Sequence, residues 1–404
     1  MKKSERKYTM TISRLTVDKL GVKLYDRVSA VIAELTANCY DADATEVEVL
    51  APMDQMLASK VGGSLVDKGL FIEIRDDGTG MTPEEIDPFY LKVGAERRND
   101  PKRGPVSKIY GRKVMGRKGI GKLAAFGICN KVEVISSGGV LVSGIDQDGR
   151  AAKGYLTAHF VMDRSQILKD TEEEYHPQVG EFDGTVRRKR GTVVRLAVFD
   201  HRRVPKIDEF ERQLSQRFGL ATANWKITLC DSSKTPTDPL YKCVVGSFSV
   251  EKMENTIVTL KGEKGVVGPD GEKLGDLEAG FTHESKFYPI TGWVAYSKYP
   301  YKDDLMAGVR IYCRGKIAAQ THIFNLKAGF TGEYNVRSYL VGEIHADWLD
   351  EGEDLIRTDR QDILWSQDLG QAFQAWGQGL VKKIWFCQPD LAHFDALIWP
   401  TPSC

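Results

Sequence analysis

Three polar side chains near the N-terminus are spaced so that they would share one face of a helix. In the segment AELTANCYDADA (33–44), Glu34, Asn38 and Asp41 stand at positions i, i+4 and i+7, a spacing that places side chains on one side of a helix. An amide oxygen such as that of Asn38 can bind Mg²⁺, which prefers oxygen ligands and shares the oxygens of phosphates. A carboxylate one turn away can polarise a water molecule for in-line attack on a phosphate. The alternative is a solvated helix face that binds nothing.

A second candidate is the segment RDDGTGM (75–81), which directly follows the apolar run LFIEI (70–74). Asp76 would stand where a strand ends, and Gly78 and Gly80 would let the backbone turn sharply and let a flat ring approach closely. A buried carboxylate at that position is a good acceptor for an exocyclic amine such as that of adenine. The alternative is a plain turn, because Asp-Gly is common in turns.

A glycine-rich segment, GRKVMGRKGIGKLAAFG (111–127), is the candidate for binding phosphates. Gly116, Gly119 and Gly121 would expose backbone N–H groups, and a helix after them would present its positive end. Residues 100–122 contain eight Lys or Arg and one Asp. Such a local excess of positive charge suits a flexible lid over a triphosphate, and the alternative is a solvated basic loop.

Several familiar sites are excluded by their spacing. Gly116 to Lys122 fits the start of a P-loop, but Leu123 stands where that motif requires Ser or Thr to bind Mg²⁺. The Asp spacing of a calcium-binding loop is absent. The seven Cys contain no C-x-x-C pair, which indicates reduced cysteines and no zinc site.

The elements around these segments predict an α+β protein. An apolar stripe of period 3.6 predicts a helix over 26–40, and Thr82 followed by Pro83 and Glu85 predicts a helix start. Helices and strands alternate over the first 200 residues, which is typical of an α/β sandwich. Apolar patterns predict strands at 45–50, 70–74, 131–136, 139–145, 191–199, 290–297 and 308–320.

The same patterns predict the division of the chain into domains. Residues 1–203 would form the sandwich, and 204–375 a smaller α/β domain that begins with a connecting helix at 204–219. Residues 231–287 are rich in Gly, Lys, Asp and Pro and would form an irregular insertion of loops and short hairpins. Residues 376–404 would form a helical tail.

The overall composition is that of an ordinary globular protein. The chain has 404 residues, 42% hydrophobic and 28% charged, with a formal net charge of zero, so only local patches could indicate nucleic acid. The basic N-terminus has no apolar stretch of a signal peptide, and no run approaches the ~18 apolar residues of a membrane span. We therefore expect a cytoplasmic protein without a membrane partner.

In their order and types, the three segments together resemble the GHKL ATPases, the group of DNA gyrase B, the ninety-kilodalton heat-shock chaperones, histidine kinases and MutL. AELTANCYDADA is similar to the first motif of the family, RDDGTGM to the second and GRKGIGK to the third. Gly191 and Thr192, at the start of a strand, resemble the fourth. The spacing and the entry GVKLY…AVIAEL are most similar to the chaperone and MORC-like branch. The resemblance implies a Bergerat-type ATP-binding sandwich followed by a transducer-like domain.

The resemblance also implies roles for single residues. Glu34 would be the general base and Asn38 the Mg²⁺ ligand, while Asp76 would bind the amino group of adenine. The remaining residues that the resemblance places at the nucleotide are Asp41, Gly78, Gly80, Met81, Gly116, Gly119, Gly121, Lys122 and Thr192.

In the second half the resemblance is weaker. The segment up to residue 365 is similar in layout to the chaperone segment whose Arg reaches the γ-phosphate, so Arg360 would be that Arg. Its alternative is a surface Arg paired with Asp359 or Asp362, and Lys316 is a lesser candidate for a phosphate contact. No His precedes residue 159, which argues against a histidine kinase.

The implied function is Mg²⁺-dependent ATP binding and slow ATP hydrolysis. A lid at about 89–118 would close over ATP, and closure would let two N-terminal domains form a homodimer that acts as a conformational switch. One alternative is a nucleotide-gated module that binds DNA or protein with little hydrolysis, using the basic segments 100–122 and 187–190. Another is a chaperone-like remodeller. Small relatives of this branch also occur in bacterial defence systems.

Overall fold

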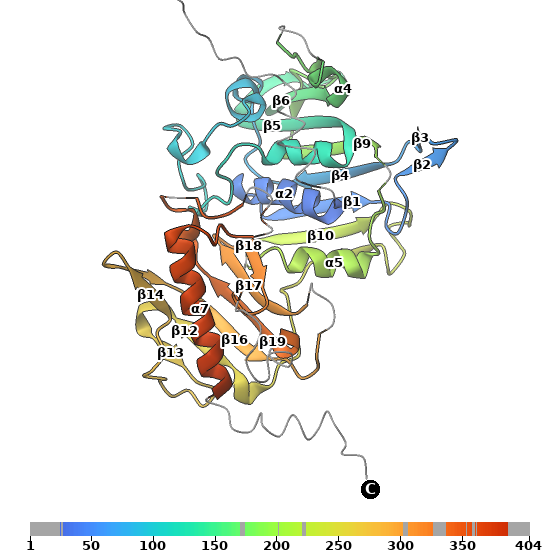
Figure 1. The fold of residues 1–404 in the computed structure, drawn as a ribbon. Helices are drawn as coiled ribbons and strands as arrows, with labels where there is room; N and C mark the ends of the chain where they lie inside the picture. Colours follow the sequence, from blue (N-terminus) through green and yellow to red (C-terminus); the bar gives the residue numbers. More distant parts are fainter. Residues whose placement is uncertain are drawn as a thin grey trace, which may run out of the picture. The chain divides into compact units, whose positions relative to one another are not determined.

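The structure is a computed structural model that describes two compact units of the chain (Figure 1). The first comprises Met1–Leu214 and Thr222–Gly246, and the second Ser215–Ala221 and Ser247–Cys404. The residues described are 25, 27–169, 174–200, 202–219, 224–301, 306–325, 337–352, 354–357, 360 and 362–386.

The first unit is built on a nine-stranded sheet whose strands do not follow the order of the chain. The order is β11-β10-β1-β4-β9-β5-β6-β7, and β8 pairs with β6. Strands β1 and β10 are parallel, and the other pairs are antiparallel. The strands are β1 (Glu46–Ala51), β4 (Phe71–Asp76), β5 (Cys129–Ile145), β6 (Ala151–Asp163), β7 (Gln178–Val179), β8 (Val186–Arg187), β9 (Gly191–Phe199), β10 (Lys226–Asp231) and β11 (Lys242–Val244). A separate hairpin of β2 (Ala58–Val61) and β3 (Ser64–Asp67) extends from this unit.

Helix α2 (Val28–Asp41) covers one face of this sheet (Figure 1). Its apolar stripe, which includes Ile32 and Leu35, is almost completely buried, as are Ile72 and Ile74 of β4. Each such side chain contributes about 1.5–3 kcal/mol by leaving water. Because side chains alternate along a strand, Glu73 and its neighbours two residues away on β4 point to the opposite face. We call this second face the open face of the sheet.

Two helices of the first unit differ from the predicted form. Thr82 is the N-cap of α3 (Pro83–Glu85) with the predicted capping box, but the chain continues as a π-helix, η2 (Ile86–Leu91). Pro88 lies within it and has no N–H for a helical hydrogen bond. The glycine-rich segment leads into a 3₁₀-helix, η4 (Gly121–Gly127), and the expected α-helix is absent. A helix this short offers little of the predicted dipole.

Strand β5 also differs, because it joins the two strands predicted at 131–136 and 139–145. Its pairing with β6 shifts register between Gly138 and Leu141. Two extra residues in β5, Gly139 and Val140, produce this shift, and glycine accommodates the bend. The two glycines at 138 and 139 interrupt the alternating apolar pattern of the sequence, but β5 continues through them.

The second unit contains a six-stranded sheet of order β13-β12-β16-β19-β17-β18. Its strands are β12 (Val258–Lys261), β13 (Val266–Val267), β16 (Thr291–Tyr296), β17 (Gly308–Cys313), β18 (Lys316–Thr321) and β19 (Leu340–His345). The hairpin β14 (Gly280–His283) and β15 (Lys286–Pro289) and helix α7 (Asp368–Phe386) complete it. Phe373 of α7 packs among Phe281, Trp348 and Trp365, with ring centroids 5.2–6.1 Å apart. This aromatic cluster joins helix and hairpin to one core.

The compact units differ from the division predicted at residue 203. Strand β10 pairs with β1, so residues after the helix α5 (Ile207–Ser215) return to the first sheet. The segment 231–287 contains five short strands, and the predicted tail at 376–404 begins inside α7 and ends outside the described residues. In the described part of the chain, no helix is both long and apolar enough to cross a membrane.

Candidate functional site

Helix α2 presents the predicted catalytic row next to the glycine-rich segment. Asn38 is exposed and Glu34 is partly buried. A Cβ atom added to Gly121 would lie 3.1 Å from Oε2 of Glu34. The backbone of the glycine-rich segment therefore comes within contact distance of the predicted base, and a residue larger than glycine would crowd it.

Asp41 occupies a different environment from the rest of the row. It is 4% exposed, its Oδ1 accepts a hydrogen bond from the N–H of Met115 at 2.7 Å, and its Oδ2 accepts one from Gly116 at 2.9 Å. Both carboxylate oxygens thus hold the backbone at the start of the glycine-rich segment. Its predicted contact with the nucleotide stays a prediction, since the structure shows a positioning role.

At the end of β4, two backbone donors hold the carboxylate of Asp76. Its Oδ1 accepts hydrogen bonds from the N–H of Gly78 at 2.9 Å and of Thr192 at 3.2 Å. Burial raises the pKa of Asp76 to about 6, although these hydrogen bonds act in the opposite direction. Both backbone hydrogen bonds end on Oδ1, and the buried Cys39 thiol also forms a hydrogen bond with this carboxylate.

A hydroxyl that the sequence did not reveal connects this carboxylate to the following turn. Ser136 of β5 accepts a hydrogen bond from the N–H of Met81 at 2.9 Å, and its Oγ lies 2.8 Å from Oγ1 of Thr192. Ser136 and Thr192 are register partners in β5 and β9. Asp76, Met81 and Thr192, far apart in the sequence, are thereby joined by one chain of hydrogen bonds.

The turn between Asp76 and Met81 requires glycine. Gly80 has a φ of +62°, and a Cβ atom there would lie 1.9 Å from the carbonyl oxygen of Ser137. A Cβ atom on Gly78 would lie 2.6 Å from the carbonyl oxygen of Ala42, at the end of α2. The turn is therefore packed between α2 and β5 with no room for side chains at these two positions, and its predicted close approach to a flat ring stays a prediction.

Gly119, in the glycine-rich segment, packs against Ala95 of the predicted lid (89–118). Its φ is +65°, and a Cβ atom would lie 2.3 Å from the carbonyl oxygen of Ala95. Lys122 donates a hydrogen bond from Nζ to the carbonyl oxygen of Lys92 at 2.5 Å. Burial, followed by the charge of Arg103, lowers the pKa of Lys122 to about 8.

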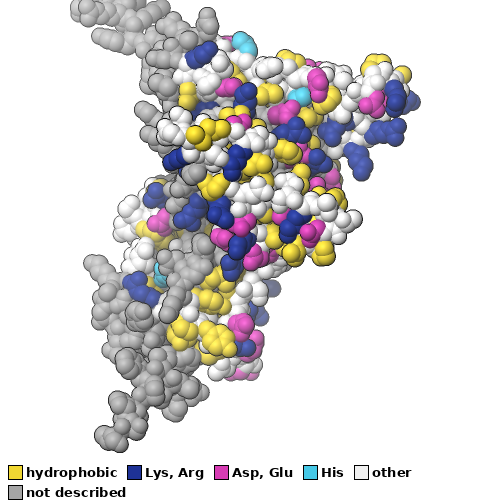
Figure 2. Space-filling view, turned by 90° about the vertical axis from the view of Figure 1, so that its right-hand side faces the viewer, with side chains coloured by type: hydrophobic (Ala, Val, Ile, Leu, Met, Phe, Trp, Pro, Cys, Tyr) yellow, Lys and Arg dark blue, Asp and Glu magenta, His cyan; other side chains and the backbone are white. Residues whose placement is uncertain are grey.

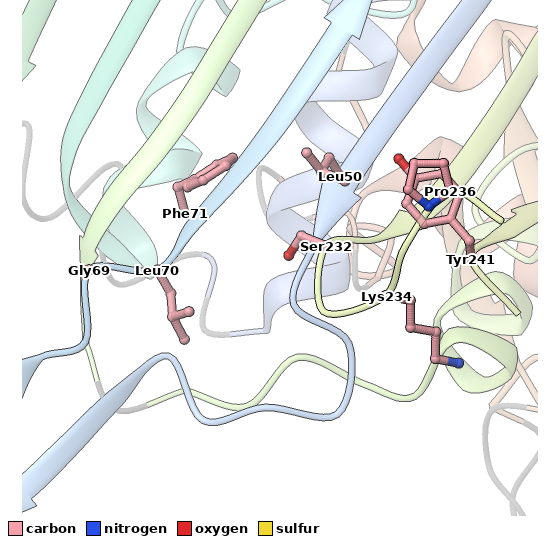
Figure 3. A pocket seen from close by; sticks show the side chains of 8 residues that line it. All are labelled: Leu50, Gly69, Leu70, Phe71, Ser232, Lys234, Pro236 and Tyr241. Atoms are coloured by element: carbon pink, nitrogen blue, oxygen red, sulfur yellow. The ribbon is translucent and has the colours of Figure 1, made fainter. Parts of the chain in front are cut away.

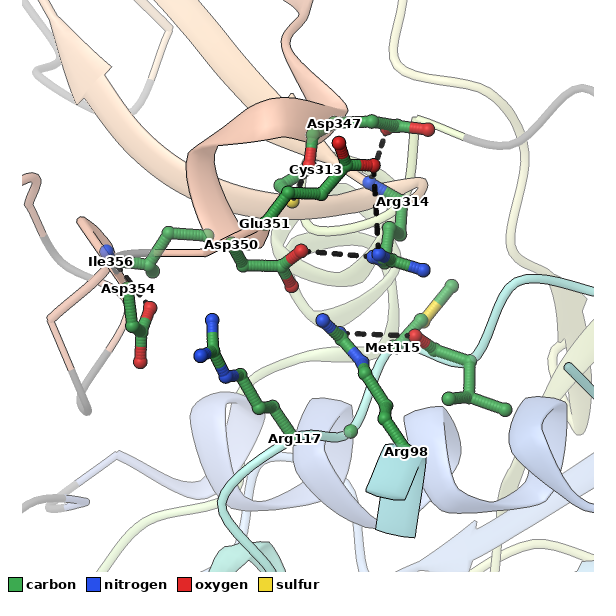
Figure 4. Close-up of polar contacts among 12 residues, drawn as sticks. Arg98, Met115, Arg117, Cys313, Arg314, Asp347, Asp350, Glu351, Asp354 and Ile356 are labelled. Carbon is green, nitrogen blue, oxygen red and sulfur yellow. Dashed lines mark hydrogen bonds and ion pairs between the residues drawn. The ribbon is translucent and has the colours of Figure 1, made fainter. Parts of the chain in front are cut away.

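Several basic side chains of the lid are structural. Arg112 donates to the carbonyl oxygens of Tyr40 and Ala44 at 3.2 and 2.7 Å and lies 4.6 Å from the centre of the Tyr40 ring. Arg98 donates to the carbonyl oxygen of Val114, beside Met115 (Figure 4). The sequence alone favoured a lid whose positive charge faces a triphosphate. It could not show these structural roles, because hydrogen bonds from a side chain to backbone carbonyls leave no pattern in the sequence.

The predicted sensor Arg360 lies in the second unit. Its Nη1 donates to the carbonyl oxygen of Ile317 at 3.3 Å. Arg314, which lies three residues before Ile317, forms an ion pair with Asp350 at 2.9 Å. Its backbone N–H donates a hydrogen bond to the carboxylate of Asp347 (Figure 4). Lys316 is 4% exposed. Each unit is described by itself, so the approach of Arg360 to a nucleotide stays a prediction.

A pocket of about 360 Å³ lies at the other end of β4, away from Asp76 (Figure 3). Phe71 opens this strand and Asp76 closes it, a separation of roughly 17 Å at the usual rise of a strand. The pocket contains none of the predicted site residues. Its lining consists of Leu50, Gly69, Leu70, Phe71, Ser232, Lys234, Pro236 and Tyr241.

The donor set around α2 suits magnesium better than a transition metal. In the parts of the chain described here, no three His, Cys, Asp or Glu side chains gather as a metal site. The exposed carboxamide of Asn38 offers a neutral oxygen of the kind that can bind Mg²⁺. Magnesium commonly binds to one or two such ligands and takes its remaining ligands from water and phosphate oxygens.

Two comparisons with known proteins bear on this site. Residues 25–185 match the model of the family described as histidine kinase-, DNA gyrase B-, and HSP90-like ATPase. The chain is also similar to a putative type II restriction enzyme, HgiDII, of Herpetosiphon aurantiacus, with 26% identity over 382 residues. These residues cover 89% of this chain and 52% of that protein, so the chain spans about half the length of this curated relative.

The matched residues include α2, the turn after β4 and the glycine-rich segment, while Thr192 and Arg360 lie beyond them. The mixed sheet with α2 on one face is the α/β sandwich expected for such a domain. Residues 25–185 therefore match the family that the sequence resembles, and this match supports ATP binding.

Proposed function

We propose that this protein binds ATP with Mg²⁺, hydrolyses it slowly and uses the cycle as a conformational switch. The observation that carries the proposal is the arrangement of Asp76. Two backbone N–H groups fix its Oδ1, and the closely packed glycine turn holds this carboxylate at the end of β4. A fixed carboxylate in a partly buried site selects an amino group such as that of adenine, since an unmatched donor or acceptor would be left unpaired there.

The residues of α2 would perform the chemistry. Glu34 would orient a water molecule for in-line attack on the γ-phosphate and accept its proton. Asn38 would hold Mg²⁺, which supplies neutralisation of charge on the phosphates when bound. The backbone N–H groups of Gly119 and Gly121, with the ammonium group of Lys122, would bind the phosphate oxygens.

The switch would consist of lid closure and dimerisation. The lid at 89–118 is held by backbone contacts such as the bond from Gly94 N–H to the carbonyl oxygen of Gly119 at 3.3 Å. A phosphate bound at Gly119 and Lys122 would change these contacts and so bias the lid between two positions. Arg360 would report the γ-phosphate to the second unit, and closed domains would pair as a homodimer.

The test is calorimetry of a non-hydrolysable ATP analogue with Mg²⁺, comparing the natural protein with Asp76→Asn. Because both N–H donors end on Oδ1, the amide oxygen of Asn would remain there and its NH₂ would face the adenine amino group. We expect affinity to fall at least about 10-fold, the cost of a lost hydrogen bond to a charged group. Unchanged affinity in Asp76→Asn would contradict the assignment of the base-binding carboxylate.

A second candidate is a nucleotide-gated DNA-binding module with little hydrolysis. The similarity to a putative type II restriction enzyme of Herpetosiphon aurantiacus favours a role involving DNA. The exposed basic residues at 188–190 are the feature of this chain that supports it. DNA binding that persists without nucleotide and without measurable hydrolysis would favour this candidate. Both candidates assume the cytoplasmic location that the sequence predicts.

A further inference from the structure

The segment 187–190, RRKR, crosses the first sheet next to the candidate nucleotide site. Arg187 belongs to β8, where it is the register partner of Tyr155 in β6, and Thr192 stands near the start of β9. A Cβ atom on Gly154 would lie 2.5 Å from the carbonyl oxygen of Arg187. The segment is thus held closely against the sheet and ends two residues before a predicted site residue.

The positive charge of this segment is not neutralised within the protein. Among the residues that the structure describes, no carboxylate forms an ion pair with Arg188, Lys189 or Arg190, and all three are exposed. Arg190 lies 4.7 Å from the centre of the Tyr155 ring. Burial and then the charge of Arg75 lower the pKa of Arg187.

The neighbouring open face of the sheet is charge-balanced. Glu73 pairs with both Arg75 and Arg195, and Arg195 pairs with Glu133 at 3.0 Å. Beyond it, His159 lies 3.0 Å from Glu133. On the side of the molecule seen in Figure 2, Lys and Arg side chains are interspersed with acidic and apolar ones. The excess of charge is therefore local to 187–190 and is not a property of the whole face.

We propose that Arg187, Arg188, Lys189 and Arg190, with Lys153 and Tyr155 beside them, bind the phosphate backbone of double-stranded DNA. The inference deepens the second candidate function and rests on it. Four successive cations with no intervening acid fit a polymer of closely spaced phosphates better than a single carboxylate. Three of them are Arg, whose planar group matches the oxygens of a phosphate. A backbone contact of this kind carries no sequence preference.

The test uses the full chain and a fluorescent 20-base-pair duplex of arbitrary sequence, with anisotropy measured between 50 and 200 mM salt. Each lost phosphate contact reduces the slope of log K against log salt by about 0.9. We expect Arg188→Ala/Lys189→Ala/Arg190→Ala to reduce it by about 2–3. The double variant Arg188→Ala/Lys189→Ala, which keeps the contact with Tyr155, should reduce it by about 2.

The matched control removes three exposed cations elsewhere, as Lys60→Ala/Lys68→Ala/Lys261→Ala. It should leave the slope unchanged, and all variants should bind the ATP analogue as the natural protein does. An unchanged slope in the triple variant, an absence of DNA binding in the natural protein, or equal binding of poly-glutamate would overturn the proposal. DNA binding by the natural protein with an unchanged slope in the triple variant would contradict only the assignment of residues 187–190, whereas absence of DNA binding in the natural protein would contradict the second candidate function as well, so the two failures are distinguishable.

Discussion

At the residue scale, the candidate site depends on how single polar groups are satisfied. Asp41 and Asp76 are both partly or fully buried carboxylates, but their hydrogen bonds differ. Both oxygens of Asp41 hold backbone N–H groups, whereas only Oδ1 of Asp76 does. The sequence grouped them as nucleotide contacts because the motif names residues and not their hydrogen bonds. The geometry separates a positioning carboxylate from one whose second oxygen can accept from a ligand.

Binding of the nucleotide should depend on pH through Asp76. Its pKa in the folded protein is about 6, raised from 3.8, so the folded state takes up this proton more readily than the unfolded state. The cost of the buried charge is therefore present above pH 6 and disappears as the pH falls through 6 towards 3.8. Adenine needs the charged acceptor, so affinity for the analogue should fall up to about 10-fold per pH unit below 6.

Calorimetry at pH 5, 6 and 7.5 would measure this effect. The phosphate groups of the analogue also titrate in this range. The pH dependence of binding to Asp76→Asn measures their contribution alone, because this variant lacks the carboxylate. A pH dependence of equal size in both proteins would show that Asp76 is not the titrating group.

At the element scale, the parts with strong periodicity were predictable. The helix predicted over 26–40 is α2 (Val28–Asp41), and the strand predicted at 191–199 is β9 (Gly191–Phe199). Short or interrupted elements were not predictable, because packing decides them. The single strand β5 runs through Gly138, and the segment after Gly121 forms a 3₁₀-helix. The return of β10 to pair with β1 is a long-range contact that no local pattern encodes.

The same limit explains why the sequence did not predict a role for Ser136. A serine in a strand has no distinctive spacing, and its importance comes from Met81 and Thr192, which other elements bring to it. The sequence could name Asp76, Gly78, Met81 and Thr192 because they belong to motifs. It could not show that β5 connects them.

Ser136→Ala should therefore weaken nucleotide binding through the turn, without direct contact. Loss of its hydroxyl leaves the N–H of Met81 and the hydroxyl of Thr192 without their acceptor and partner. We expect affinity for the analogue to fall about 5-fold or more, from the cost of an unsatisfied buried group. The ratio of the affinity for ATP to the affinity for GTP should decrease as well. Ser136→Thr, which keeps the hydroxyl, should restore both the affinity for the analogue and this ratio.

Ser137→Ala is the matched control. Ser137 is a buried neighbour with a similar bond, 2.9 Å from Oγ1 of Thr157, on the other face of the strand. Equal losses of affinity and selectivity in both alanine variants would indicate a general effect on the sheet and would exclude a positioning role for Ser136.

At the scale of the whole molecule, the chain combines a segment that matches an ATPase family with a second unit whose role is proposed. The family match covers residues 25–185, and the six-stranded sheet with α7 lies beyond it. Arg360 belongs to that second unit, so its link to the γ-phosphate would be made only when the two units act together. The relative with a restriction-enzyme name is about twice as long as the matched chain, and DNA as a partner is accordingly our proposal.

The central claim is that one chain both binds ATP and hydrolyses it through Glu34, and Glu34→Ala tests it most directly. We would measure analogue affinity and steady-state phosphate release in the natural protein, in Glu34→Ala and in the control Glu181→Ala, which removes an exposed carboxylate. General-base catalysis contributes about 10²–10⁴-fold, so Glu34→Ala should lose at least about 100-fold in rate with affinity preserved. Hydrolysis at the natural rate in Glu34→Ala would contradict the account.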